Sequence, residues 1–354
     1  MSEPTPESLR VGTASAAPAA GRVRVAAVDC GTNSIRLLIA DVPDSRGSGA
    51  TDAGGPALTD VHREMRVVRL GEGVDATGRL SEAALERTRR ALTDYAATIR
   101  ATGAQRVRMA ATSATRDAQN RSAFVAMVRE VLGQDPEVIT GQEEAALSFT
   151  GAVGELDPAS GPFLVVDIGG GSTELVTGAR RADGPGAEAT EVFGAISLDL
   201  GCVRLTERLL HSDPPTADER AAAVDWVRAQ LSAGLDAIPL ADVAGRPVGR
   251  FVPVAGTATT VAAAALGLTE YDADRIHLST VGFDRVREVA DFFLDATRAE
   301  RAALGYMHPG RVDVIGGGSL ILATLAELVA DRTGLSTMTA SEHDILDGLA
   351  LSLA

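Results

Sequence analysis

The order of apolar and polar positions predicts strands and helices that alternate along most of the chain. The valine-rich run VRVAAVDC, residues 23–30, suits a strand buried on both faces. Two further apolar runs, residues 35–42 and 61–70, predict the next strands. An apolar stripe at helical spacing then extends from Ser81, a favourable N-cap residue, to about Thr102.

The same alternation continues to the end of the sequence. The pattern predicts further strands at residues 105–111, 136–140 and 163–168, and helices at 120–133, 141–153 and 341–354. Asn120 and Ser341 are the expected N-caps of two of these helices, and Gly133 is an expected C-cap. Alternating strands and helices predict an α/β protein whose mixed sheets are flanked by helices.

The length of 354 residues suits two domains, each with its own core. Residues 1–22 are rich in Ser, Ala and Pro, which predicts a disordered tail. The first domain is expected at residues 23–153, with the C-terminal helix 341–354 packing back on it. The polar stretch 154–162 then predicts a linker, and residues 160–340 the second domain.

Charge and composition exclude several partners. The net charge of −15 argues against attraction to nucleic acid or to an anionic membrane, and aromatic residues, at 3%, are too few for base stacking. Two cysteines make no disulfide framework, and no apolar run reaches the length of a membrane span. We therefore expect a cytoplasmic protein without nucleic-acid or membrane partners, and a homodimer stays open.

One short motif occurs twice. AVDCGTNSIRLLI and VVDIGGGSTELVT align Asp29 with Asp167 and Ser34 with Ser172, at a separation of 138 residues, about one domain length. Both copies continue into strand-like residues, which predicts a strand–turn–strand hairpin and not a dinucleotide-binding strand–turn–helix. A P-loop is excluded because the chain has no lysine. Each motif alone is compatible with a simple Asx turn, and the repetition favours function.

Glycine-rich turns of this kind present backbone amides to an anion such as phosphate. The residues expected to line the phosphate path are Gly31, Thr32, Asn33, Ser34, Gly169, Gly170, Gly171, Ser172 and Thr173. Two later turns, at Gly256–Thr257 and Gly316–Gly317, are each predicted to join a strand to a helix N-terminus, a second type of phosphate site. An aspartate at the strand end suits hydrated Mg²⁺, which uses only one or two carboxylates.

With these motifs the chain resembles the exopolyphosphatase and guanosine-pentaphosphate phosphatase family, in its short form. The resemblance rests on RLGEGVDATGRLSEAAL, AATSATRDAQNR, VITGQEEAALSF, VVDIGGGSTELV and LGCVRLTERL, and covers nearly everything from Val23 onward. It implies two related actin-like (ribonuclease-H-like) domains with a cleft between them. It also implies Mg²⁺-dependent hydrolysis of phosphoanhydride bonds.

The resemblance also implies roles for individual residues. Glu144 is the implied general base, with Glu143 as an assisting or structural neighbour, although two acids in a first helical turn are also stabilised by the helix dipole. Arg116 is the implied phosphate-neutralising cation beside the cleft. Asp29, Asp167 and Glu174 are the expected metal-binding carboxylates, and Arg36 and Arg204 are weaker candidates for substrate contact. The five histidines show no metal-ligand spacing and are expected at the surface or in caps.

Several functions stay open on the sequence. The leading hypothesis is an exopolyphosphatase that releases orthophosphate from inorganic polyphosphate, and the alternative is hydrolysis of guanosine pentaphosphate by the same residues. An ATP-dependent kinase is disfavoured by ITGQEEA, because a water-activating glutamate would waste ATP. A non-enzymatic alarmone-binding protein is disfavoured because Asp29, Glu144 and Asp167 are all present.

Overall fold

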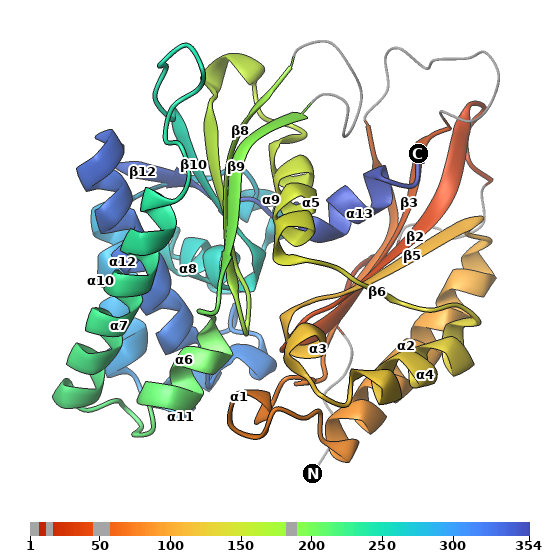
Figure 1. Ribbon diagram of the computed structural model, residues 1–354, viewed down its shortest axis with the longest axis horizontal. Helices are drawn as coiled ribbons and strands as arrows, with labels where there is room; N and C mark the ends of the chain where they lie inside the picture. The colour runs from red at the N-terminus through yellow and green to blue at the C-terminus, as the bar shows by residue number, and fades with distance from the viewer. Residues whose placement is uncertain (1–6, 12–16, 45–56, 182–189) are drawn as a thin grey trace. The chain divides into compact units, whose positions relative to one another are not determined.

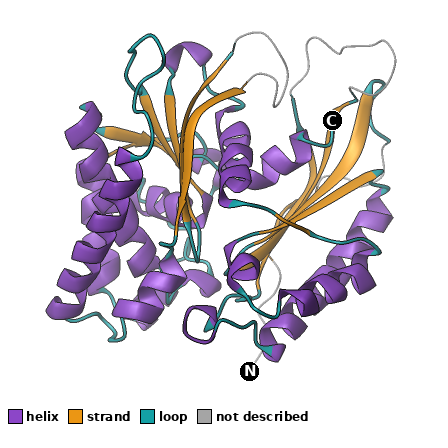
Figure 2. Cartoon of the chain, in the orientation of Figure 1, coloured by secondary structure: helices purple, strands orange, loops and turns teal. Residues whose placement is uncertain are grey.

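The computed structural model describes residues 7–11, 17–44, 57–181 and 190–354. Its two mixed sheets, each flanked by helices, confirm the predicted α/β class (Figure 2). The chain divides into two compact units, and it crosses from one to the other after Thr140 and after Asp344. Among the described residues, no helix is both long and apolar enough to cross a membrane.

Unit 1 contains a six-stranded sheet in the order β1-β4-β3-β2-β5-β6. Its strands are β1 (Glu7–Val11), β2 (Arg22–Cys30), β3 (Ser34–Pro43), β4 (Thr59–Val67), β5 (Arg106–Ala111) and β6 (Glu137–Val138). Its helices are α1 (Val74–Thr77), α2 (Glu82–Thr102), α3 (Ser113–Asp117), α4 (Arg121–Leu132) and α13 (Ile345–Leu351) (Figure 1).

Unit 2 contains a second six-stranded sheet in the order β11-β12-β10-β7-β8-β9. Its strands are β7 (Phe163–Ile168), β8 (Thr173–Arg180), β9 (Thr190–Leu198), β10 (Arg250–Val254), β11 (Thr280–Gly282) and β12 (Thr337–Thr339). Its longer helices are α5 (Gly141–Val153), α6 (Cys202–Leu209), α7 (Ala217–Asp236), α8 (Ala255–Ala265), α10 (Phe283–Asp295) and α12 (Ile315–Thr333). Its short helical turns are α9 (Ala273–Ile276), α11 (Arg298–Ala302), η1 (Pro158–Ser160) and η3 (Pro309–Arg311).

The two sheets share a topology. In unit 1, β2 and β3 form an antiparallel hairpin, β4 extends it on one side, and β5 pairs parallel to β2 on the other. In unit 2, β7 and β8 form the hairpin, β9 extends it, and β10 pairs parallel to β7. The structure therefore confirms the strand–turn–strand reading of both motifs.

In each unit, the sheet face that carries the aspartate of the hairpin is covered by one helix, α13 in unit 1 and α5 in unit 2. In unit 1, α2 and α4 pack on the face formed by Ala26, Val28 and Cys30 (Figure 1). Side chains alternate between faces along a strand, so Asp29 lies on the other face, which α13 covers. Arg63 of β4 anchors α13 through hydrogen bonds to the buried carboxylate of Asp347.

In unit 2, α5 covers the corresponding face. Its apolar side chains, including Phe149 and Val153, pack with Val165 of β7 and Val176 of β8. This packing places α5 in unit 2, whereas the sequence analysis assigned residues 141–153 to the first domain. The expected linker at 154–162 also lies within unit 2 and follows α5 directly.

Four local predictions were wrong. Asn120 precedes α4, but its side chain makes no cap and bonds both backbone groups of Leu80 instead. The last helix begins at Ile345, because the hydroxyl of Ser341 accepts from the His343 amide and holds a turn there. The N-terminal tail contains β1, paired with β4. No strand leads directly into α12, because residues 312–314 form a turn there. The predicted caps Ser81 and Gly133 are confirmed.

Candidate active site

The turns of the two hairpins have the same backbone geometry. In the first, the amide of Gly31 donates to the carbonyl of Ser34 at 3.0 Å. In the second, the amide of Gly169 donates to the carbonyl of Ser172, also at 3.0 Å. The two sequence motifs that align therefore form turns closed by the same hydrogen bond.

The carbonyl groups of the second turn are held by the first residues of α6. The amides of Cys202 and Val203 donate to the carbonyls of Gly169 and Gly170, at 3.0 and 2.9 Å. The Nε of Arg204 donates to the carbonyl of Gly171 at 2.8 Å. Since the next amide in a trans peptide points opposite to the carbonyl, the amides of residues 170–172 face away from α6. This row of N–H groups has the character of an anion-binding nest.

The carbonyl groups of the first turn are held by the segment that follows β4. The amides of Val68 and Arg69 donate to the carbonyl of Asn33, at 3.0 and 2.8 Å, and the amide of Gly71 donates to that of Thr32 at 2.8 Å. Arg69 adopts a φ of 49°, a conformation that residues other than glycine rarely take. The RLGEG segment therefore orients the first turn as the LGCVRL segment orients the second.

The cross-strand partner of each aspartate distinguishes the two hairpins. Asp29 faces Arg36 across β2 and β3, and one guanidinium nitrogen lies 2.6 Å from the carboxylate. At the equivalent position in unit 2, Asp167 faces Glu174. The first turn thus carries a neutralised ion pair, whereas the second carries two carboxylates on one face.

Helix α5 adds a third acid to the unit 2 group. Glu144 in its first turn is 7% exposed, whereas Glu143 is exposed to solvent. Ser148, four residues after Glu144 and so on the same helix face, donates to Asp167 at 2.8 Å. The helix therefore holds Glu144 on the sheet face that carries Asp167 and Glu174.

Glycine at the start of α5 permits this approach. A Cβ on Gly141 would lie 2.3 Å from the Cβ of Ser197 on β9, closer than real side chains come. Ser197 lies opposite Glu174 in the sheet and donates to its Oε1 at 2.7 Å. Ser148 and Ser197 were missed on sequence, although the helical spacing from Glu144 could have indicated Ser148.

Burial and charge act strongly on Glu174. The residue is 1% exposed, and this burial, followed by the charges of Glu144 and Asp167, raises its pKa well above the usual range. Hydrogen bonds from Ser197 and Ser172 act in the opposite direction and do not outweigh these effects. A carboxyl group with a raised pKa keeps its proton at higher pH, unless a bound cation stabilises the charged form.

Oxygen ligands crowded in this way fit a hard divalent cation. Mg²⁺ prefers one or two carboxylates together with waters, and Asp167 and Glu174 offer them beside a turn of backbone amides. Asp29, the third expected metal ligand, is bonded to Arg36 through both Nε and a terminal nitrogen. The residues of unit 2 therefore fit Mg²⁺ better than those of unit 1.

Arg116 lies at the end of α3, in unit 1. One of its terminal nitrogens donates to the carbonyl of Ile139 at 3.1 Å, which orients the side chain. Ser113, at the start of α3, shares a hydrogen bond of 2.8 Å with Thr32 of the first turn. The segment TSATRD is thus tied to the first turn, and phosphate contact by Arg116 stays a prediction.

The two later glycine turns are closely packed. A Cβ on Gly317 would lie 2.8 Å from the Oγ1 of Thr206, and one on Gly318 would lie 2.6 Å from that of Thr257. A Cβ on Gly256 would lie 2.4 Å from the guanidinium carbon of Arg311. Close helix packing is thus sufficient reason for these glycines. Phosphate contact at Gly256, Thr257, Gly316 and Gly317 stays a prediction.

The repeated sheet with its two Asp-x-Gly turns places the protein in the actin-like ATPase superfamily. Within it, the model of the Ppx/GppA phosphatase family matches residues 50–353, and the chain belongs to that family. Exopolyphosphatase 2 of Mycobacterium tuberculosis is 54% identical over 336 residues, which cover 94% of this chain and 98% of the relative.

Solved structures agree with this assignment. The crystal structure of an exopolyphosphatase-like protein has 40% identity and a TM-score of 0.82, covering 94% of this chain and 98% of the other. The Ppx/GppA protein of Aquifex aeolicus has 30% identity and a TM-score of 0.72, covering 94% and 97%.

Proposed function

We propose that this protein is an exopolyphosphatase, which hydrolyses the terminal phosphoanhydride bond of inorganic polyphosphate and releases orthophosphate. The observation that carries the proposal is the group formed by Glu144, Asp167 and Glu174 beside the second amide turn. The similarity to Exopolyphosphatase 2 over nearly the full length of both chains supports the choice of substrate.

Glu144 is the general base in this proposal. Its place in the first turn of α5 sets the carboxylate close enough to act on Glu174, and a positioned carboxylate can accept a proton from the attacking water. The bond from water oxygen to the terminal phosphorus forms as the bridging P–O bond breaks, and the shortened chain leaves with the bridging oxygen.

Backbone amides and arginine side chains supply the groups that bind phosphate in this proposal. The amides of residues 170–172 donate to phosphoryl oxygens, and Arg116 supplies local positive charge in a chain whose net charge is −15. Asp167 and Glu174 would hold Mg²⁺, which would supply charge neutralisation at the phosphate. Asp29 orients Arg36 in this scheme.

An assay of the purified chain with defined substrates tests the proposal. Phosphate release is measured with short polyphosphate, long polyphosphate, guanosine pentaphosphate and ATP, each with and without Mg²⁺. The proposal requires the highest kcat/KM on one of the polyphosphates and dependence on Mg²⁺. Preference for guanosine pentaphosphate would instead favour the alternative phosphohydrolase, and absence of turnover with all four would refute an enzyme of this class.

A further inference from the structure

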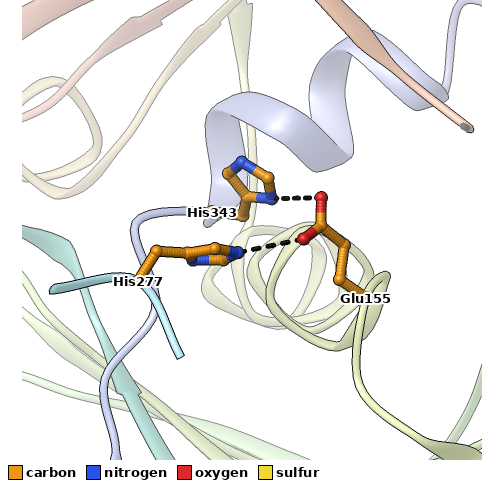
Figure 3. Close-up of side chains that lie close together, drawn as sticks. All are labelled: Glu155, His277 and His343. Atoms are coloured by element: carbon orange, nitrogen blue, oxygen red, sulfur yellow. Dashed lines mark hydrogen bonds and ion pairs between the residues drawn. The ribbon is translucent and has the colours of Figure 1, made fainter. Parts of the chain in front are cut away.

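Two histidines and a glutamate of unit 2 come together away from the candidate active site. The Nε2 of His277 lies 3.1 Å from one carboxylate oxygen of Glu155, and the Nδ1 of His343 lies 3.7 Å from the other (Figure 3). The two imidazole rings are stacked at a tilt, with centroids 4.4 Å apart. One ligand atom from each residue lies within 4.8 Å of the other two.

The backbone on both sides of the cluster is fixed. Leu278, which follows His277, has a φ of 57° and donates its amide to the carbonyl of Ala340 at 2.7 Å. The buried hydroxyl of Ser341 accepts from the amide of His343 at 3.0 Å and donates to its carbonyl at 2.9 Å. Both rings therefore start from well-determined positions, as a preorganised ligand site requires.

Glu155 is held less rigidly but close by. It follows α5, where the amide of Leu156 donates to the carbonyl of Val153 at 3.1 Å, and Leu156 is buried. The side chain of Glu155 itself is 57% exposed. Its carboxylate can therefore adjust to an ion without disturbing the core.

These distances suit a small transition-metal ion. Tetrahedral Zn²⁺ binds imidazole and carboxylate at about 2.0–2.2 Å, so its ligand atoms lie about 3.4 Å apart. The separations of His277 Nε2 from Oε2 of Glu155 and of His343 Nδ1 from Oε1, 3.1 and 3.7 Å, lie on either side of that value, so either carboxylate oxygen is placed to share an ion with a ring. Two imidazoles also favour Zn²⁺, Ni²⁺ or Cu²⁺ over Mg²⁺, which prefers oxygen ligands. We propose that Glu155, His277 and His343 form a binding site for a divalent transition-metal ion, with water completing the coordination.

Metal binding has a local consequence at His277. Its Nδ1 accepts from the amide of Glu342 at 3.2 Å, so the proton of the neutral ring resides on Nε2 and points to Glu155. Coordination through Nε2 moves this proton to Nδ1, and the Glu342 amide must then turn away. The ion thus displaces the Glu342 amide, shortly before the chain crosses into unit 1.

Calorimetric titration of the full chain with Zn²⁺, in a buffer containing excess Mg²⁺, tests the site. We expect one saturable site per chain. His277→Ala and His343→Ala should each weaken binding by about tenfold or more, since each removes a ligand. Glu155→Gln should weaken it too, and because Glu155 is exposed this variant keeps its fold. His211→Ala, which removes an exposed histidine elsewhere in unit 2, is the matched control and should bind as the parent does.

A nuclear magnetic resonance measurement adds a readout that adventitious binding would not move. On addition of Zn²⁺, the amide resonance of Glu342 should shift and exchange faster with solvent, because it loses its acceptor on His277. The proposal is overturned by absence of saturable binding, or by equal binding in the three cluster variants and the parent. It is also overturned if His211→Ala weakens binding as much as they do.

Discussion

The hairpins of units 1 and 2 share a backbone and differ in charge. Both place an aspartate at the end of the first strand and close the turn with the same glycine-to-serine hydrogen bond. Opposite the aspartate stands Arg36 in unit 1 and Glu174 in unit 2. The difference between Arg36 and Glu174 at one register position thus gives the first hairpin an ion pair and the second a pair of acids.

The helix on each hairpin increases this difference. In unit 1, α13 carries Asp347, whose charge Arg63 already satisfies. In unit 2, α5 carries Glu144, which adds to Asp167 and Glu174 and raises the pKa of Glu174. In the function proposed above, the catalytic carboxylates belong to unit 2 and the unit 1 turn serves substrate binding.

The largest effect is expected from removing the base. Glu144→Gln should lower kcat by about 10²–10⁴-fold with little change in KM, because the base acts only in the transition state. Steady-state phosphate release measures both constants. Glu143→Gln, its exposed neighbour, should keep most of the activity. Equal losses in the two variants would contradict the assignment.

A steric test addresses the second turn. Gly201→Ala would place a Cβ 2.3 Å from the carbonyl oxygen of Gly170 and should displace the turn, reducing kcat/KM by about 10²-fold. Gly282→Ala is the control, since it is also an N-cap glycine and has no atom within 4 Å of the added Cβ. Normal kinetics for Gly201→Ala would show that the turn tolerates movement.

The ion pair of unit 1 is tested through stability. Arg36→Gln leaves Asp29, only 6% exposed, without its guanidinium partner and should lower the free energy of unfolding by about 1.5–3 kcal/mol. Urea unfolding measures this change. Arg90→Gln breaks the exposed pair with Glu86 and should cost less than about 1 kcal/mol. Equal losses of unfolding free energy in the two variants would mean that burial does not strengthen the Asp29–Arg36 pair.

Arg116 is tested through affinity. Arg116→Ala should raise KM for polyphosphate by about tenfold at low salt and by less at high salt, because ions screen the lost attraction. Arg129→Ala removes an exposed arginine that pairs with Asp135, and should change KM little. A KM for Arg116→Ala that equals the parent value at every ionic strength would exclude substrate contact.

The smallest effect concerns the pH dependence of stability without metal. The unfolded chain releases the Glu174 proton near pH 4.5, whereas burial and the neighbouring acids raise the pKa in the folded state. The contribution of Glu174 to the free energy of unfolding is therefore fully present below pH 4.5. It is lost as the pH rises toward the pKa of Glu174 in the folded state. In buffer with a metal chelator, Glu174→Gln should remove this loss and melt slightly higher at neutral pH. A lower melting temperature would contradict it.

Much of the fold could be predicted from local pattern. The buried strands, the α2 helix with its Ser81 cap and the repeated hairpin follow from apolar spacing and turn residues, which act over a few positions. The errors arose where a distant group competes for a side chain. Asn120 binds Leu80 instead of capping α4, and α5 follows the core of unit 2 although the chain order suggested the first domain.

The sequence by itself determined the α/β class, the two Asp-x-Gly turns and, through its resemblance to a family, the choice of Glu144. Tertiary structure alone decided which charges meet. It set Arg36 against Asp29, brought Ser148 and Ser197 to the acidic group, and joined His277 to His343 from distant parts of the chain. The physical reason is that strand and turn preferences act between neighbours, whereas electrostatic and coordination contacts depend on distance in space.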